Sequence, residues 1–395
     1  MPEDATVGKQ IRKLRVAAGL EAKQLAEEVG LDPTAISKIE AGRRAVKTDE
    51  LVNIADSLGV SPLAFLEPNS LLARLQVAAR STTDQLDYTL HRRLTALAEL
   101  DNVLSAGGIA KSVKELPSRT SDREMWLHTA KRLAKWAREH LDLAEGGDRL
   151  YQLARAIEDK LGIDVLIEEH DPSSLGAAIT DHEFPLILVN AAQPYNRALF
   201  TLAHELGHIL ADDGTALLVH RSLVGTNDRE RVANAFAAEF LLPEDEVKWY
   251  LGDWGRDAES LGKMMVTFSV SWESLVYRLH NLHIINAESR DHLLEIGFAG
   301  LLREVDDVDL LEKMGALRNH AKRRSPGLLE QRLWDGYRNG IVSIRPLAGL
   351  LGIDPEELLA RNNRPYPGPH VIRVPSAVER GQVEADEDLY SMEPF

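Results

Sequence analysis

The stretch FTLAHELGH, residues 200–208, carries the strongest structural signal in this chain. Its apolar residues favour a helix, and residues four positions apart on a helix lie on the same face. His204 and His208 can therefore reach one metal ion from one surface. Glu205 directly follows the first His, where a carboxylate can act on water without binding the metal itself. This His-Glu-x-x-His pattern is typical of the helix of a zinc metallopeptidase.

Two His ligands do not complete such a site, because a catalytic zinc ion takes three protein ligands and leaves one position open. Glu230 is the predicted third ligand. It follows His208 by 22 residues in a predicted helix, and Asn234 lies four residues further on the same face. Asn234 can orient Glu230 or a His ligand without binding the metal itself. The alternatives for the third ligand are Glu239, Asp212 and His220.

The expected reaction is hydrolysis of a peptide bond. Glu205 would accept a proton from water as general base and pass it to the leaving amine. An oxyanion stabiliser is also needed, and the sequence leaves Tyr195, Arg197 and His220 as candidates. Zn²⁺ is the expected ion, although Mn²⁺ also suits His and carboxylate ligands.

Composition limits the class of protein. A length of 395 residues suggests two to four domains, and 44% hydrophobic with 27% charged residues is typical of a globular protein. No apolar run approaches the roughly 20 residues that a membrane helix needs. The N-terminus lacks the pattern of a signal peptide, so we expect a cytoplasmic protein without membrane association. The chain has no cysteine, which leaves His, Asp and Glu as metal ligands.

The net charge of −16 argues against broad adhesion to nucleic acid. The charge is uneven, however. Residues 1–67 contain nine Lys and Arg side chains and are close to neutral, so most of the negative charge lies in the rest of the chain. Any contact with DNA should therefore be local and made by the N-terminal segment.

Residues 1–67 predict five short helices separated by Gly residues. Thr34 is expected to cap the third helix and Thr48 the fourth, and Ser61-Pro62 would open the fifth. Two short helices joined by a tight turn form a helix-turn-helix unit. QLAEEVG (24–30) and ISKIEAG (36–42) closely resemble the corresponding motifs of the XRE-type, or phage-repressor, family.

This resemblance implies binding to a double-stranded DNA operator, and a homodimer is expected because one such domain buries little DNA surface. Ala22 stands where the family often has a Gln that contacts DNA. The recognition helix would present four side chains to base edges, and basic residues would neutralise phosphates. The predicted DNA-binding residues are Lys23, Thr34, Ala35, Ser37, Lys38, Arg43, Arg44 and Lys47.

A second resemblance covers roughly residues 121–250. FTLAHELGH together with ANAFAAEFLLP (233–243) looks like the ImmA/IrrE family of metallopeptidases. In that family a Glu shortly before the Ala-Asn pair is the third ligand. Many members have it directly before that pair, where this chain has Val232, whereas Glu230 lies four residues before Asn234. The resemblance implies that the substrate is itself a protein, typically a repressor or an antitoxin.

The remaining chain predicts a mainly α fold with a small α+β domain. Helices are expected at 82–104, 125–143, 150–161, 229–242 and 261–282, with a helix start at Val270-Ser271-Trp272 inside the last stretch, and strands at 163–167 and 184–189. His91-Arg92-Arg93 is interpreted as a solvated face, and Trp272 and Trp334 as core residues. The predicted domains are a helix-turn-helix domain (1–67), a helical linker (68–120), a zincin-like metallopeptidase domain (121–250), a helical extension (251–295), a helical C-terminal domain (296–378) and an acidic disordered tail (379–395).

Three functions fit these observations. The first is a DNA-binding regulator whose zinc-dependent endopeptidase cleaves a repressor or an antitoxin. The second is a transcription factor whose peptidase-like domain senses a ligand or a metal without cutting, although Glu205 would then have no purpose. The third is the antitoxin or immunity half of a two-gene system, whose acidic bulk binds a basic partner.

Overall fold

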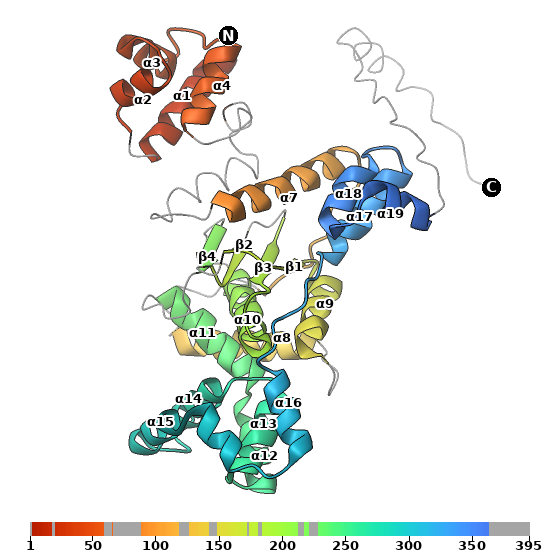
Figure 1. The fold of residues 1–395 in the computed structure, drawn as a ribbon. Coiled ribbons are helices and arrows are strands. Elements are labelled where there is room, and N and C mark those ends of the chain that lie inside the picture. The colour runs from red at the N-terminus through yellow and green to blue at the C-terminus, as the bar shows by residue number, and fades with distance from the viewer. Residues whose placement is uncertain are drawn as a thin grey trace, which may run out of the picture. The chain divides into compact units, whose positions relative to one another are not determined.

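The computed structural model describes residues 2–17, 20–58, 65, 88–117, 126–141, 148–171, 174–180, 184–211, 217–220 and 228–362. The chain divides into two compact units, Met1–Arg332 and Leu333–Phe395. Helices dominate the described residues, and the described strands form one small sheet (Figure 1). The prediction of a mainly α fold with a small α+β domain is therefore confirmed. No helix among the described residues is long and apolar enough to cross a membrane.

The N-terminal segment contains four described helices around their own small core. Because the apolar positions repeat at helical spacing, Ile11, Leu25, Ile36 and Ile54 point inward and are fully buried. Gly30 allows the turn before the third helix, since its φ of 68° is left-handed. The fifth predicted helix lies outside the described residues. The four helices are α1 (Pro2–Ala17), α2 (Ala22–Glu28), α3 (Pro33–Glu40) and α4 (Thr48–Ser57).

The two predicted helix caps in this segment are wrong by one or two positions. Asp32 caps α3, because its Oδ1 accepts a hydrogen bond of 2.8 Å from the Thr34 amide, and Pro33 takes the first helical position. Lys47 rather than Thr48 precedes α4. Its amide donates to Glu50 Oε2 at 3.1 Å. At α3 a carboxylate therefore takes the capping role expected of a Thr hydroxyl, whereas at α4 the Glu50 carboxylate accepts from the amide of the cap residue itself.

The described part of the long predicted helix is α7 (Tyr88–Ala106). The interpretation of Arg93 as part of a solvated face is wrong. Its guanidinium makes two hydrogen bonds of 2.8 and 2.9 Å to the Glu168 carboxylate at the end of the first strand. A bidentate Arg–carboxylate pair fixes the orientation of the two side chains as well as their distance. Arg93 therefore attaches α7 to the sheet.

The sheet has four strands in the order β1-β3-β2-β4. β1 pairs with β3 in parallel, and β2 pairs antiparallel with both β3 and β4. Two of the four strands were predicted, and β2 and β4 were missed. In β2, Gly-Ala-Ala-Ile lacks alternation because it is buried at every position. The strands of the sheet, the two helices before them and the helix among them are, in chain order, α8 (Trp126–His140), α9 (Arg149–Leu161), β1 (Asp164–Glu168), β2 (Gly176–Ile179), β3 (Leu186–Asn190), α10 (Tyr195–Ala211) and β4 (Leu217–His220).

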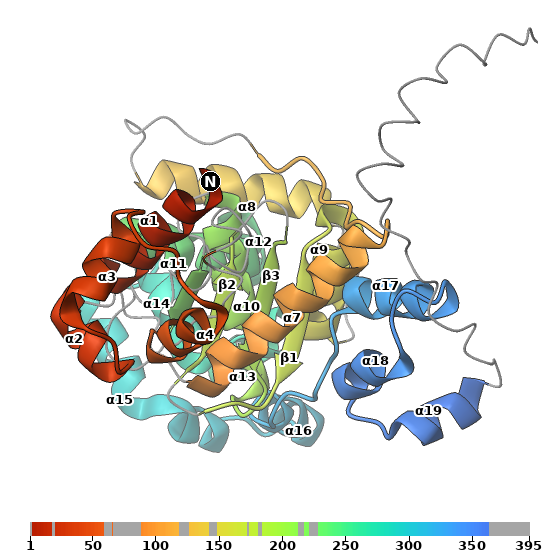
Figure 2. The same cartoon turned by 90° about the horizontal axis from the view of Figure 1, so that it is seen from above.

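The main core lies between this sheet and the helices. α10 crosses one face of the sheet next to β2 and β3, as both views show (Figures 1 and 2). Its other neighbours are α8, α9 and α11 (Asp228–Leu241). A helix covered on so many sides must be apolar around most of its circumference, and every residue from Thr201 to Leu210 is indeed buried. Any polar group in this part of α10 is therefore inside the protein.

A helical layer follows the sheet. The helix start predicted at Val270-Ser271-Trp272 is confirmed, because Ser269 adopts a left-handed φ of 55° and ends one helix, and Ser271 caps the next. The helical stretch 261–282 is therefore two helices. Trp272 is 2% exposed, which confirms it as a core residue. The helices are α11 (Asp228–Leu241), α12 (Glu244–Trp254), α13 (Ala258–Phe268), α14 (Trp272–Asn281), α15 (Ala287–Arg303) and α16 (Val308–Ala316).

The last described helices are α17 (Gly327–Arg338), α18 (Ile344–Leu351) and α19 (Pro355–Asn362). Trp334 is half-buried and contacts the Tyr337 ring and the Arg338 guanidinium, so it is less enclosed than predicted. The predicted acidic tail, 379–395, lies outside the described residues.

Candidate metal centre

α10 holds both predicted His ligands in the interior. His204, Glu205 and His208 are between 0 and 1% exposed. The helical spacing sets His204 and His208 one turn apart on one side of the helix. Their Nε2 atoms approach each other to 3.1 Å. Two imidazoles with their side-chain nitrogens this close in an apolar core are costly unless other polar groups complete the arrangement.

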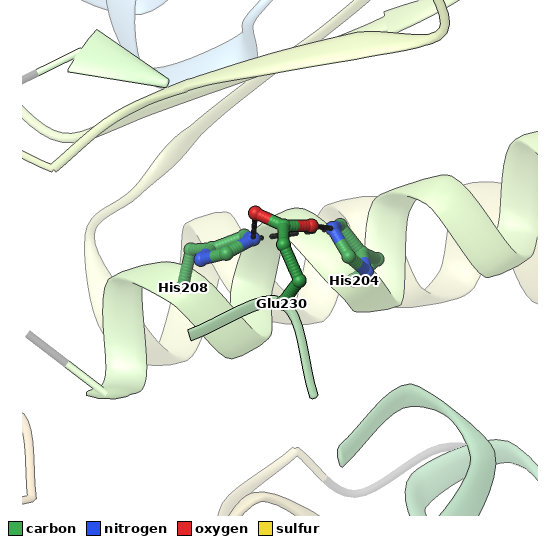
Figure 3. Close-up of side chains that lie close together, drawn as sticks. All are labelled: His204, His208 and Glu230. Carbon is green, nitrogen blue, oxygen red and sulfur yellow. Dashed lines mark hydrogen bonds and ion pairs between the residues drawn. The ribbon is translucent and has the colours of Figure 1, made fainter. Parts of the chain in front are cut away.

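Glu230, near the start of α11, points its carboxylate at these two nitrogens (Figure 3). Its Oε2 lies 3.4 Å from His204 Nε2, and its Oε1 lies 3.5 Å from His208 Nε2. One ligand atom from each of the three side chains falls within 4.8 Å of the others. Among the described residues, this is the one cluster of His, Asp and Glu with such spacing.

Gly207 explains how α11 comes close enough to deliver Glu230. A Cβ atom added at Gly207 would lie 2.9 Å from Phe236 Cδ1 and 3.2 Å from Ala233 Cα. Any larger residue would therefore push α11 away from α10. Ala233 and Phe236 are fully buried at this contact. The Gly inside the His-Glu-x-x-His pattern thus sets the distance between the two helices that carry the cluster.

Asn234, one turn after Glu230, supports the cluster from the other side of His204. The His204 Nδ1 lies 3.0 Å from Asn234 Oδ1. An amide oxygen only accepts hydrogen bonds, so Nδ1 carries the proton and donates it. The lone pair of His204 is then on Nε2, the nitrogen that faces Glu230. Asn234 thereby fixes both the tautomer and the orientation of the ring.

Glu205 lies on the side of α10 that faces β2. It is fully buried. Gly176, the first residue of β2, leaves room for it, since a Cβ at that position would lie 3.0 Å from Glu205 Oε1 and 2.6 Å from Thr201 Cγ2. The sheet therefore passes directly over the carboxylate, which limits the orientations that Glu205 can adopt.

The cluster fits a zinc ion. Three donors held about 2.0–2.1 Å from one ion at tetrahedral angles are about 3.4 Å apart. The three measured separations are 3.1, 3.4 and 3.5 Å. Two neutral imidazoles and one carboxylate are also a ligand set that zinc takes in catalytic sites. Neither the geometry nor the ligand types excludes manganese.

The rival third ligands lie elsewhere or outside the described side chains. Glu239 accepts a 2.6 Å hydrogen bond from Arg278, which also donates to the Leu242 carbonyl. Asp212 lies outside the described residues. His220 ends β4, and the structure describes its backbone alone. Of the described candidates, Glu230 is the one brought to the His pair.

Of the three oxyanion candidates, the two with described side chains, Tyr195 and Arg197, are not brought to the cluster. Tyr195, at the start of α10, donates its hydroxyl proton to Asp148 at 2.5 Å and accepts from the Leu150 amide at 2.8 Å. Burial and the hydrogen bond to Asp148 raise the pKa of Tyr195 well above its ordinary value. The Tyr195 hydroxyl is thus hydrogen-bonded to residues at the start of α9. Arg197 is exposed and lines a separate pocket.

The predicted DNA-binding residues of the N-terminal segment gather on one surface. The exposed side chains line a shallow hollow between the starts of α2 and α3 and the loop after α3; they are Lys23, Thr34, Ser37, Lys38 and Arg43. Lys47 is exposed on the loop before α4. The structure thus brings most of the set onto one polar, mainly basic face, which is what a recognition helix presents to DNA.

Two members of the set differ from expectation. Ala35 is only 9% exposed and packs inward, because it falls on the core side of α3. Arg44 donates to Glu50 at 2.5 Å and is half-buried, so it holds the start of α4. Its guanidinium is therefore already paired with a carboxylate.

Several residues that shape the centre were not singled out from the sequence. Gly176 and Gly207 act by having no side chain, and a single sequence gives no sign of which Gly permits a close contact. Asn190 is a third case. Its amide donates to the carbonyls of His170, Asp171 and Ser174, which ties the loop before β2 to the end of β3. Its position directly after a predicted strand was the available signal.

Comparisons with known proteins agree with both parts of the chain. The sequence model of the Helix-turn-helix family matches residues 11–65, and that of the IrrE N-terminal-like domain matches residues 158–280. The second match includes β1–β4, α10 and α11, and so the whole cluster. The chain therefore contains an XRE-type helix-turn-helix domain and an IrrE-like domain of the metallopeptidase type.

Two curated relatives span different parts of the chain. The radiation response metalloprotease IrrE of Deinococcus radiodurans is 34% identical over 104 residues, which is 25% of this chain and 32% of that protein. The HTH-type transcriptional regulator RamB of Mycobacterium tuberculosis is 22% identical over 323 residues, which is 70% of this chain and 65% of that protein. The matched segment thus covers less than two thirds of either relative. Together these findings support a helix-turn-helix domain joined to a peptidase-like domain in one chain.

Proposed function

We propose that this protein is a DNA-binding transcription regulator whose IrrE-like domain is a zinc-dependent endopeptidase. Its substrate would be a protein, a repressor or an antitoxin, cut at one site. The observation that carries this proposal is the meeting of Glu230 with His204 and His208, with Glu205 buried next to them. The likeness to a protein named a metalloprotease supports it.

In this proposal His204, His208 and Glu230 hold the ion. A bound zinc ion would polarise the scissile carbonyl and lower the pKa of water toward about 7. Glu205 receives the proton of the attacking water on its carboxylate and returns it to the leaving amine. Asn234 keeps His204 in the tautomer that offers Nε2 to the ion. The apolar surroundings of α10 exclude bulk water and so strengthen each of these interactions.

The helix-turn-helix domain would bring the peptidase to an operator or to a repressor bound there. Ser37 and Lys38 would reach base edges, and Lys23 and Arg43 would contact phosphates. Binding as a homodimer would double the DNA surface that is covered. This division of labour accounts for a near-neutral N-terminal segment in a chain with a net charge of −16.

A regulator that does not cut is the second candidate. The observation in its favour is the likeness to a protein named a transcriptional regulator, which extends over 70% of this chain. Under this hypothesis the cluster binds a metal or stabilises the fold, and Glu205 has no chemical task. The third candidate is an antitoxin that binds a basic partner. Its only support is the negative net charge of the chain.

Glu205→Gln separates these candidates. If the chain is a peptidase, the variant keeps its zinc and loses cleavage about 10²–10⁴-fold, because the amide cannot accept a proton. New protein N-termini would be compared between cells that express the wild-type chain and cells that express the variant. Glu139→Gln, on the exposed side of α8, is the matched control. Identical N-termini in all three, with unchanged regulation of target genes, would favour the regulator that does not cut.

A further inference from the structure

A cavity lies next to the metal cluster but is not lined by the residues of that cluster. This partly open cavity of about 620 Å³ is lined by residues of α10, α11, α13 and α14, with Phe298 of α15 and Arg318 beyond α16. None of His204, Glu205, His208 and Glu230 lines it. Its volume is in the range of small-molecule sites, which is about 300–1,000 Å³. The cavity is thus large enough for a ligand and does not belong to the cleavage site.

The walls of the cavity supply an apolar surface made largely of rings. Phe200, Trp272, Tyr277 and Phe298 come from three different helices and all line it. Trp272 is held in place because its indole N–H donates to the Leu293 carbonyl at 2.9 Å. Tyr277 is 50% exposed, so part of its ring is accessible. Such a lining favours a ligand with a flat or branched apolar body.

The charged groups of the cavity are mainly cationic. Arg197 and Arg318 are exposed, and among the described residues neither has an ion-pair partner. The Arg318 guanidinium lies over the Phe298 ring, 5.2 Å from its centroid, so charge and apolar surface adjoin. Arg278 is paired with a carboxylate, and Glu273 is the one acidic side chain of the lining. In a chain with a net charge of −16, this local excess of Arg favours an anion.

Asn234 connects the cavity with the metal cluster. It lines the cavity, and its Oδ1 accepts the hydrogen bond from His204 Nδ1. A ligand that contacts Asn234 would change how firmly His204 is held, and the coupling must act in both directions. The route consists of one side chain, so it needs no large rearrangement.

We propose that this cavity binds a small amphipathic carboxylate as an effector of the protein. Its apolar body lies against Phe200, Trp272 and Phe298, and its carboxylate pairs with Arg197 and Arg318. Occupation of the cavity changes the affinity of the neighbouring cluster for zinc through Asn234. Ligand binding itself requires neither cleavage nor zinc, so it can be tested even if the proposed peptidase activity fails.

The probe is naphthylacetate, and naphthylacetamide is its uncharged match of nearly equal size. Calorimetry on the full chain, with and without zinc, should show that the carboxylate binds at least about tenfold more tightly than the amide. Arg197→Gln and Arg318→Gln, made together, should remove this difference. Arg303→Gln, exposed on α15 outside the cavity, should leave it unchanged.

A zinc titration in the presence of saturating naphthylacetate gives the second readout. The apparent zinc affinity of the wild-type chain should shift several-fold, and that of the Arg197/Arg318 double variant should not. Absence of binding, equal binding of acid and amide, or a carboxylate preference that persists in the double variant would each overturn the proposed anion site. If the apparent zinc affinity of the wild-type chain is the same with and without bound naphthylacetate, the proposed coupling through Asn234 is wrong.

Discussion

The helix-turn-helix domain and the IrrE-like domain keep their candidate functional side chains in opposite environments. Lys23, Ser37, Lys38 and Arg43 are exposed around a small core of their own. The metal cluster and Glu205 are instead enclosed in the main core, where polar groups must satisfy one another. Substitutions on the DNA-facing surface should therefore change binding and leave stability alone, whereas substitutions around the cluster should change both function and the packing that supports it.

Outside Glu205 and the three proposed ligands, the largest effect is expected at Asn234, which contacts His204. Asn234→Ala removes the acceptor for His204 Nδ1 and should weaken zinc binding about 10–100-fold. Asn234→Asp keeps an oxygen at that position and should retain most of the affinity. Competition with a chelating dye measures both. Equal zinc affinity in Asn234→Ala and the wild type would show that the His204 ring is held by something else.

The next effect concerns the contact between α10 and α11. Gly207→Ala should cost about 1–3 kcal/mol in the free energy of unfolding, because the new Cβ meets Phe236 and Ala233. It should also weaken zinc binding, since α11 carries Glu230. Gly252→Ala on α12 is the control, because nothing lies within 4 Å of a Cβ there; it should stabilise by about 0.5–1 kcal/mol. Urea unfolding compares the pair, and a neutral Gly207→Ala would contradict the close approach.

Neighbouring arginines sharpen the contrast within the helix-turn-helix domain. Arg43→Ala should reduce the slope of log affinity against log salt by about one, as expected for a lost phosphate contact, with no change in the thermal midpoint. Arg44→Ala should lower the midpoint, because it breaks the pair with Glu50. Operator binding at several salt concentrations and thermal unfolding test both variants. If the two results were exchanged, the assignment of the exposed face would be wrong.

The smallest effect is expected at the cap of α3. Hydrogen bonds from Thr34 lower the pKa of Asp32 below its ordinary value of 3.8. A carboxylate with a lowered pKa stabilises the fold above the unfolded value, and this contribution is lost as the pH falls through the folded value. Asp32→Asn keeps a capping oxygen that does not titrate. The thermal midpoint of the wild type should therefore fall more steeply below pH 3.8 than that of the variant; parallel curves would rule this out.

Much of this arrangement could be predicted from the sequence because it depends on local spacing. The His pair follows from the helical repeat, and α2 and α3 follow from caps, glycines and apolar periodicity. Glu230 was reached by adding helix-face geometry to a family resemblance. The prediction failed where tertiary contacts decide: β2 has no alternation, Arg93 pairs with a residue 75 positions away, and Gly176 and Gly207 matter because of neighbours brought in by folding.

The cavity near Asn234 also depends on tertiary contacts and could not be predicted from local sequence patterns. Its walls come from α10, α11, α13 and α14, so no segment of the sequence contains its pattern. The break between α13 and α14 at Ser269 agrees with the helix start predicted at residues 270–272, but the contacts that make Trp272 and Tyr277 line the cavity come from other helices. Long-range packing thus creates both the missed structure and the proposed effector site.

Metal content of the purified chain tests the central claim most directly. Elemental analysis of the wild type, His204→Ala and Glu230→Ala should find about one zinc per chain in the wild type and none in either variant. Zinc that is retained in Glu230→Ala but lost in His204→Ala would move the third ligand to another residue. A wild-type chain that binds no metal even when zinc is supplied would contradict the account.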